Sequence, residues 1–158
     1  MELLRDARRR ADDGLRLCEQ QDYQGALGKF AHVFVYLDAL PRKADSHLIK
    51  CIMGSIDEED EAELTTLRNS VLLNQAFCLL KLHKPARALI KCDQALELLR
   101  SSKGLYRRVK ALLALGRLQE AEDDALEGVN RGESDFTSLL SKIRRKRCED
   151  GGEVVVDK

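Results

Sequence analysis

Apolar residues recur every three to four positions along most of the chain, which places them on one face of successive α-helices. Pro41 ends the second of these segments, Pro85 suits the first turn of the fourth, and Ser101 or Ser102 can cap the fifth. The chain is therefore predicted to be all-α. The seven predicted helices cover residues 3–20, 24–40, 61–82, 85–99, 101–116, 118–129 and 136–148.

Two stretches depart from the helical period. Within residues 42–60, His47–Met53 is apolar enough for a short helical turn, and the acidic run 57–61 is typical of a solvated loop or of a helix start. The tail, residues 149–158, is predicted to be disordered. No linker separates the helices, so we expect one domain over residues 1–148.

One pattern occurs three times. A compact residue is followed three positions later by an apolar one, and the next helix places a small residue opposite them. Ala26, Ala88 and Ala121 hold that last position, at offsets of 62 and 33 residues. An unrelated bundle would also be rich in Ala and Leu, but three copies in register favour a repeat. The copies are Gly14-x2-Leu17…Ala26-x3-Phe30, Ala76-x2-Leu79…Ala88-x3-Cys92 and Val109-x2-Leu112…Ala121-x3-Ala125.

This spacing resembles the tetratricopeptide repeat (TPR) of roughly 34 residues, with about 28 residues inserted after the first copy. The segments Leu73–Leu82 and Ser102–Arg108 are similar to those of co-chaperone TPR domains, as in FKBP-type immunophilins and the tetratricopeptide repeat protein 9 family. The resemblance implies an α-α superhelix of three TPR hairpins closed by a capping helix. The implied boundaries are about 7–40, 69–101 and 102–132 for the repeats and 135–148 for the cap.

In the resembled co-chaperones, the first helices of the repeats line a groove that binds the Glu-Glu-Val-Asp terminus of Hsp90 or Hsp70. Five Lys, Arg and Asn positions, the carboxylate clamp, bind its carboxylates. Three of the five match here: Asn74, Lys103 and Arg107. Ala11 and Leu15 stand where the first repeat of that family has Lys and Asn, so the implied clamp is incomplete.

Further residues complete the predicted groove. Arg8 lies one helical turn before Ala11 and offers a partial replacement for the missing charge. Leu15 makes the groove more apolar, Leu73 and Phe77 are expected to make apolar contacts, and Lys110 adds to the basic third-repeat face. Two functions follow as alternatives: an adaptor for a chaperone C-terminal peptide, or a scaffold for another extended or helical peptide in a more apolar groove.

The charge balance narrows the choice of partner. The chain has 27 basic and 27 acidic residues, so its formal net charge is zero. A polyanion such as nucleic acid is not expected, and the basic run 142–147 is interpreted as a solvated helix end. No apolar run approaches the ~20 residues of a membrane span, and the first residues lack a signal region. We expect a monomer in the cytoplasm, with the nucleus as a second compartment.

The sequence carries no catalytic motif. It has no phosphate-binding glycine loop, nucleophile elbow or HExxH motif, so we expect neither an enzyme nor a cofactor. The five cysteines are irregularly spaced and have neither disulfide-framework nor zinc spacing. Cys18, Cys78 and Cys92 are predicted to be buried apolar residues. A non-catalytic binding module is the predicted class of protein.

Overall fold

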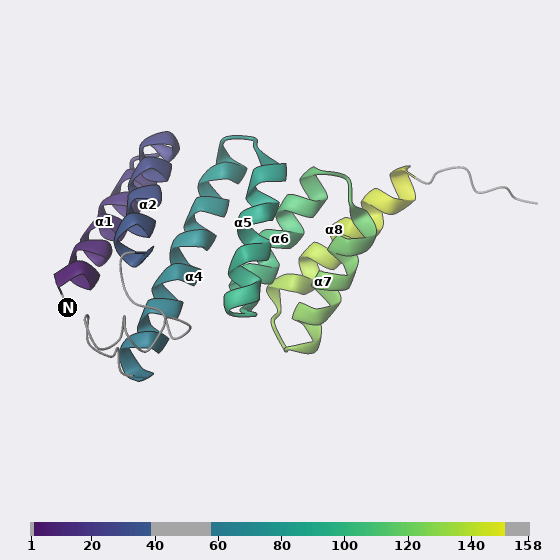
Figure 1. The fold of residues 1–158 in the computed structure, drawn as a ribbon. Coiled ribbons are helices and arrows are strands. Elements are labelled where there is room, and N and C mark those ends of the chain that lie inside the picture. Colours follow the sequence, from purple (N-terminus) through teal and green to yellow (C-terminus); the bar gives the residue numbers. More distant parts are fainter. Residues whose placement is uncertain (1, 39–57, 151–158) are drawn as a thin grey trace, which may run out of the picture.

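The structure, a computed structural model, describes residues 2–38 and 58–150. Seven helices lie in this part of the chain, and Figure 1 shows them side by side in chain order, with α1 at one end of the array and α8 at the other. The helices are α1 (Glu2–Glu19), α2 (Tyr23–Asp38), α4 (Glu58–Lys81), α5 (Pro85–Leu98), α6 (Ser102–Ala114), α7 (Leu118–Asn130) and α8 (Asp135–Asp150).

The predicted helices are confirmed, with shifts of a few residues at their ends. The acidic run 57–61, for which the sequence allowed either a loop or a helix start, belongs to α4 from Glu58 onwards. Residues 149–150 of the predicted tail are helical, because α8 continues to Asp150. Residues 39–57 and 151–158, which include Pro41, the predicted turn His47–Met53 and the rest of the tail, lie outside the described residues.

The same turn joins the two helices of each hairpin. Gln21, His83 and Gly116 have positive φ angles of 62°, 56° and 74°, and they are separated by the repeat offsets of 62 and 33 residues. The N–H after each of them donates to a carbonyl five residues earlier, which ends the first helix and reverses the chain. These hydrogen bonds are Asp22 N to Leu17 O (2.9 Å), Lys84 N to Leu79 O (2.8 Å) and Arg117 N to Leu112 O (3.0 Å).

The repeated small residues allow close helix packing. Ala26, Ala88 and Ala121 are fully buried. At Gly14, a Cβ atom would lie only 2.5 Å from Cε1 of Phe30, so the two helices of the first hairpin meet there without a side chain on α1. The repeat pattern read from the sequence is therefore the packing pattern of the hairpins.

The buried apolar residues form two main clusters that meet at α4. The first cluster joins α1, α2 and α4 and contains Phe30 and Leu37. The second joins α4 to α8 and contains Leu105, Leu112 and Phe136. Because α8 covers the last apolar face with Phe136 and its neighbours, it closes the array as a capping helix does.

The helix contacts show which face is concave. In the described part of the chain, the backbone of α1 closely approaches α4, that of α4 approaches α6, and that of α6 approaches α8, whereas the backbones of α2, α5 and α7 do not closely approach one another. Helices on the inner side of a curved array lie closer together than those on the outer side. The first helices of the hairpins, α1, α4 and α6, therefore form the concave face.

Candidate functional site

One stripe of residues on each first helix points away from the core, at successive spacings of four, three and four. Residues at these positions occupy one helix face. The α4 stripe lies 33 residues before the α6 stripe, and the α1 stripe lies 62 residues before the α4 stripe. None of the twelve residues is buried. We call these positions the concave stripes: Lys103, Arg107, Lys110 and Ala114 on α6; Ser70, Asn74, Phe77 and Lys81 on α4; Arg8, Asp12, Leu15 and Glu19 on α1.

Seven of the eight predicted site residues lie in the concave stripes, and Leu73 does not. Its side chain is only 2 % exposed and belongs to a small core cluster with Leu72 and Ala95. The prediction that Leu73 contacts a ligand is therefore wrong. Leu73 lies one residue, and so about 100° around the helix, from Asn74, and it packs α4 against α5.

Asn74, Phe77 and Arg107 form one cluster between α4 and α6. Nη1 of Arg107 donates to Oδ1 of Asn74 at 3.4 Å, and Cζ of Arg107 lies 5.5 Å from the centroid of the Phe77 ring. Nζ of Lys81 lies 5.6 Å from the same centroid, and the ring of Tyr23 packs edge-on against Phe77 at 6.0 Å. Phe77 thus contacts two cations through its π-system and holds both near Asn74.

Arg107 and Lys103, which lies one turn before it on α6, have no carboxylate partner among the residues that the structure describes. Burial lowers the pKa of Arg107 from its ordinary value, and burial together with the charge of Arg107 lowers the pKa of Lys103. Within the described residues, neither side chain forms an ion pair. An incoming carboxylate would favour the charged form of both groups and form charge-assisted hydrogen bonds with them.

Several other arginines of the described chain are paired with carboxylates. Arg108, directly after Arg107 and so about 100° around α6, faces α5 and α7, where it bonds Asp93 at 2.7 Å and Asp124 at 2.8 Å. This bridge fixes the rotation of α6 between α5 and α7 and so directs Lys103 and Arg107 to the concave face. Further pairs are Arg68–Asp38, Arg100–Glu127, Arg131–Glu127, Arg117–Glu120, Arg144–Glu122 and Arg147–Glu122.

The remaining predicted residues have distinct surroundings. Nζ of Lys110 lies 4.5 Å from the centroid of the Tyr106 ring, at the basic α6 stripe. Arg8 forms an ion pair with Glu63 of α4, so its charge is already compensated. Leu15 is 42 % exposed. The α1 stripe therefore differs from the α6 stripe, because its one cation is paired and an exposed apolar side chain lies beside it.

Sequence reasoning missed three charged members of the concave stripes. Lys81 lies one turn after Phe77 and adds a cation to the α4 stripe, whereas Asp12 and Glu19 add acidic side chains to the α1 stripe. The repeat offsets could have found them, because Asp12 is 62 residues before Asn74 and Glu19 is 62 residues before Lys81. The concave face is consequently basic at α6 and acidic to apolar at α1.

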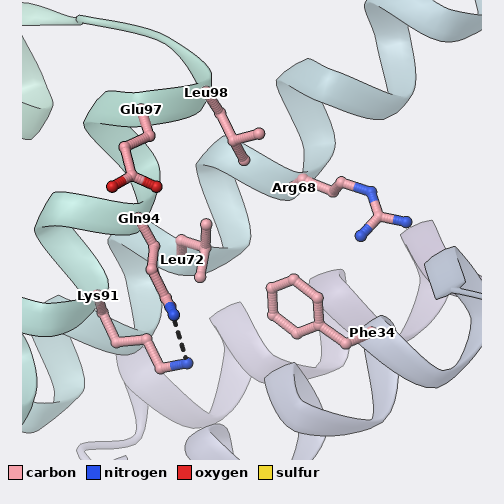
Figure 2. A pocket seen from close by; sticks show the side chains of 7 residues that line it. All are labelled: Phe34, Arg68, Leu72, Lys91, Gln94, Glu97 and Leu98. Carbon is pink, nitrogen blue, oxygen red and sulfur yellow. Dashed lines mark hydrogen bonds between the residues drawn. The ribbon is translucent and has the colours of Figure 1, made fainter. Parts of the chain in front are cut away.

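One cleft lies away from the concave stripes, and another adjoins the α6 stripe. The first cleft, of about 370 Å³, lies between α2 and α5, over α4, and the ring of Phe34 points into it (Figure 2). Its cations have partners: Arg68 bonds Asp38 at 2.9 Å, and Lys91 donates to Gln94 at 3.2 Å. A second cleft, of about 360 Å³, is lined by Ser102, Lys103, Tyr106, Glu133, Asp135 and Phe136 and extends the α6 stripe toward α8.

The structure indicates neither a metal site nor a membrane span in the part of the chain that it describes. No group of three or more His, Cys, Asp or Glu side chains there is arranged to hold a metal ion. No helix among those residues combines the length and the apolar character needed to cross a bilayer.

Comparison with known proteins identifies the fold. No protein-family model and no curated protein sequence matches the chain. The C-terminal TPR-containing domain of an FK506-binding protein of Plasmodium falciparum superposes with a TM-score of 0.78 at 16% identity, over 96% of this chain and 95% of that one. The chain therefore folds as a TPR superhelix.

Two further solved structures are TPR proteins connected with chaperones. The Hsp90 co-chaperone Cns1 of Saccharomyces cerevisiae has a TM-score of 0.74 at 21% identity, over 96% of this chain and 42% of that one. The second TPR domain of human RPAP3, solved in complex with the HSP70 peptide SGPTIEEVD, has a TM-score of 0.66 at 22% identity, over 90% and 98% of the two chains. The solved structures named here are thus TPR domains of FKBP-type and co-chaperone proteins.

Proposed function

We propose that the chain is a non-catalytic adaptor whose concave face binds the acidic C-terminal peptide of an Hsp90- or Hsp70-type chaperone. The observation that carries this proposal is the group of Asn74, Lys103 and Arg107, in which two partly desolvated cations have no carboxylate partner within the described residues. The TPR domain of human RPAP3, whose fold is similar, is solved with a peptide that ends in Glu-Glu-Val-Asp.

Each residue has a defined role in this proposal. A peptide that ends in Asp brings two carboxylates close together, and Arg107 and Lys103 compensate their charges through hydrogen bonds. The amide of Asn74 donates to the terminal carboxylate without adding a negative charge. Phe77 holds Arg107 and Lys81 by cation–π contact, so less side-chain entropy is lost when the peptide binds.

The first repeat weakens the proposed clamp. Ala11 is buried at 8 % exposure, and Arg8 is paired with Glu63, so α1 has no free cation at the position where the family has Lys. A hydrogen bond to a charged group contributes about 1.5–3 kcal/mol. We therefore expect affinity roughly tenfold or more below that of a complete five-residue clamp.

Titration tests the proposal directly. Calorimetry or fluorescence anisotropy would compare a peptide ending in Glu-Glu-Val-Asp as the free acid and as the C-terminal amide. The free acid is expected to bind at least about tenfold more tightly, because the amide lacks one of the two charges. Equal affinity for both peptides, or no binding of either, would contradict the clamp.

A matched pair of arginine variants locates the binding face. Arg107→Met keeps an apolar stem against Phe77 but removes the cation, and we expect about tenfold weaker binding of the free acid. Arg87→Ala on α5 removes an exposed arginine outside the concave stripes and should leave affinity unchanged. Circular dichroism melts of both variants verify folding. An equal loss in both would place binding elsewhere.

A second candidate partner rests on the exposure of Leu15. That side chain is 42 % exposed between the acidic residues Asp12 and Glu19, which disfavour an anionic peptide along α1. An extended or helical peptide with an apolar side chain fits this end of the groove. For such a partner, Leu15→Ser and Phe77→Ala would weaken binding more than Arg107→Met, and added salt would have little effect.

A further inference from the structure

Two cysteine sulfurs meet between α1 and α4. Cys18 lies in the last turn of α1, Cys78 lies in α4, and their Sγ atoms are 3.3 Å apart, although both are free thiols. A disulfide has an S–S distance of about 2.0 Å, so an approach of little more than about 1 Å would join them. Cys78 is fully buried, whereas Cys18 is partly exposed.

We propose that Cys18 and Cys78 are a modification site, at which a low-molecular-weight disulfide oxidises the pair to an intramolecular disulfide between α1 and α4. The Cys18 thiolate attacks one sulfur of the reagent and releases one thiolate. The Cys78 sulfur then attacks Cys18 Sγ and expels the second reagent sulfur, which takes up the Cys78 proton. The two cysteines lose two electrons, and the reagent is reduced to two thiols.

The surroundings of the two thiols decide the order of these steps. Burial, with the neighbouring Cys18 as a further cause, raises the pKa of Cys78 to about 12. A thiolate rather than a thiol attacks a disulfide, so Cys78 is a poor first nucleophile, and the more accessible Cys18 reacts first. Closure by Cys78 is consequently the slow step, helped by the 3.3 Å separation.

The other described cysteines do not offer this geometry. Cys92 is buried in α5, where burial raises its pKa to about 12, and Cys148 is exposed on α8. Among the residues that the structure describes, only Cys18 and Cys78 have sulfur atoms in contact. Oxidation should therefore select this pair over Cys92 and Cys148.

The disulfide would hold α1 against α4 at the first-repeat end of the concave face. It would tie the end of α1 to α4 next to Phe77 and close a loop of about 60 residues, because the two cysteines are 60 positions apart. Closing a loop of this length restricts the unfolded chain strongly. We expect the melting temperature of the oxidised protein to rise by roughly 10 °C.

Mass spectrometry and melting of the full chain test the proposal. The variant Cys51→Ser/Cys148→Ser, which keeps the pair, is incubated with oxidised glutathione. It should lose about 2 Da, yield a cross-linked peptide containing Cys18 and Cys78, and melt roughly 10 °C higher, with full reversal by dithiothreitol. Adding Cys18→Ser, at the partly exposed position, should abolish all three effects while the protein stays folded.

Three results would overturn the proposal. They are a stable glutathione adduct on Cys18 with no cross-link, a cross-link that maps to another pair, or a Cys18–Cys78 bond that leaves the melting temperature unchanged or lowers it. None of these readouts uses a peptide ligand, so the outcome is independent of the function proposed for the concave face.

Discussion

Gly128 of α7 is predicted to be indispensable for docking the capping helix. A Cβ atom at this position would lie 2.2 Å from Cγ of Phe136 and 2.3 and 2.4 Å from its two Cδ atoms. Phe136 is 2 % exposed, and its ring packs edge-on against Tyr106 at 5.7 Å. Gly128→Ala must therefore displace a buried ring that α8 uses to contact α6 and α7.

The magnitude follows from two opposing terms. Alanine gains about 1 kcal/mol over glycine inside a helix. Overpacking of a dense core costs about 1–3 kcal/mol, and a displaced phenylalanine also loses part of the roughly 1.5–3 kcal/mol of its burial. We expect Gly128→Ala to lower the free energy of unfolding by about 2 kcal/mol in total.

Gly28 supplies a matched control for the same substitution. It lies inside α2, it is exposed, and a Cβ atom there would meet nothing within 4 Å. Without a steric cost, Gly28→Ala should raise the free energy of unfolding by about 0.5–1 kcal/mol. The same Gly→Ala substitution is thus predicted to lower the free energy of unfolding at Gly128 and to raise it at Gly28.

Urea unfolding followed by far-UV circular dichroism measures both effects. With a slope of about 2 kcal/mol/M, the midpoint should fall by about 1 M for Gly128→Ala and rise by a few tenths of 1 M for Gly28→Ala. Midpoints that move in the same direction by similar amounts would refute the packing argument, because helix propensity alone would then explain both variants.

Two further predictions concern polar groups. Hydrogen bonds from Arg100 and Arg131 lower the pKa of Glu127 from its ordinary value of 4.5 to about 2. The ionised Glu127 therefore stabilises the folded state fully above pH 4.5, and this contribution disappears as the pH falls to about 2. Because the site is partly exposed, Glu127→Gln should cost about 1 kcal/mol at pH 7 and nothing near pH 2 by chemical unfolding; a loss that is independent of pH would contradict this account. Oε1 of Gln75 is buried and has no hydrogen-bond partner within residues 2–38 and 58–150, so Gln75→Met should raise the free energy of unfolding by about 1 kcal/mol. A clear loss in the same assay would show that the amide makes a favourable contact.

The sequence predicted the hairpins well because their determinants are local. Small residues at fixed offsets marked each helix contact. Of the two residues predicted to cap the fifth helix, Ser101 accepts the capping hydrogen bond from Gly104 N at 3.1 Å. The left-handed residues Gln21 and His83 gave no such signal, because neither is a glycine. Only the structure shows their left-handed conformation, together with the turn hydrogen bonds that recur at the repeat offsets of 62 and 33 residues.

The site was predicted less completely because it depends on how helices face one another. Leu73 and Asn74 are neighbours in the sequence, yet only the packing of α4 against α5 shows which of them is buried. The ion pair of Arg8 with Glu63 joins α1 to α4, which are far apart in the sequence. Helical periodicity within one helix does not show which residue of another helix lies beside it. Asn74 and Arg107 occupy equivalent positions 33 residues apart, and Lys103 lies one turn before Arg107, so the repeat spacing alone predicts that all three lie on the concave stripes.

The position of α4 between the two core clusters has a consequence for partial unfolding. In the described chain, α1 and α2 make their helix contacts outside the first hairpin with α4, and Leu27 is the one side chain of theirs that also packs against the second cluster. Stability in a repeat array is approximately a sum of nearest-neighbour terms. The first hairpin can therefore open while α4 to α8 remain folded. Such an opening removes Leu15 and the acidic end of the concave face but leaves Lys103 and Arg107 in place.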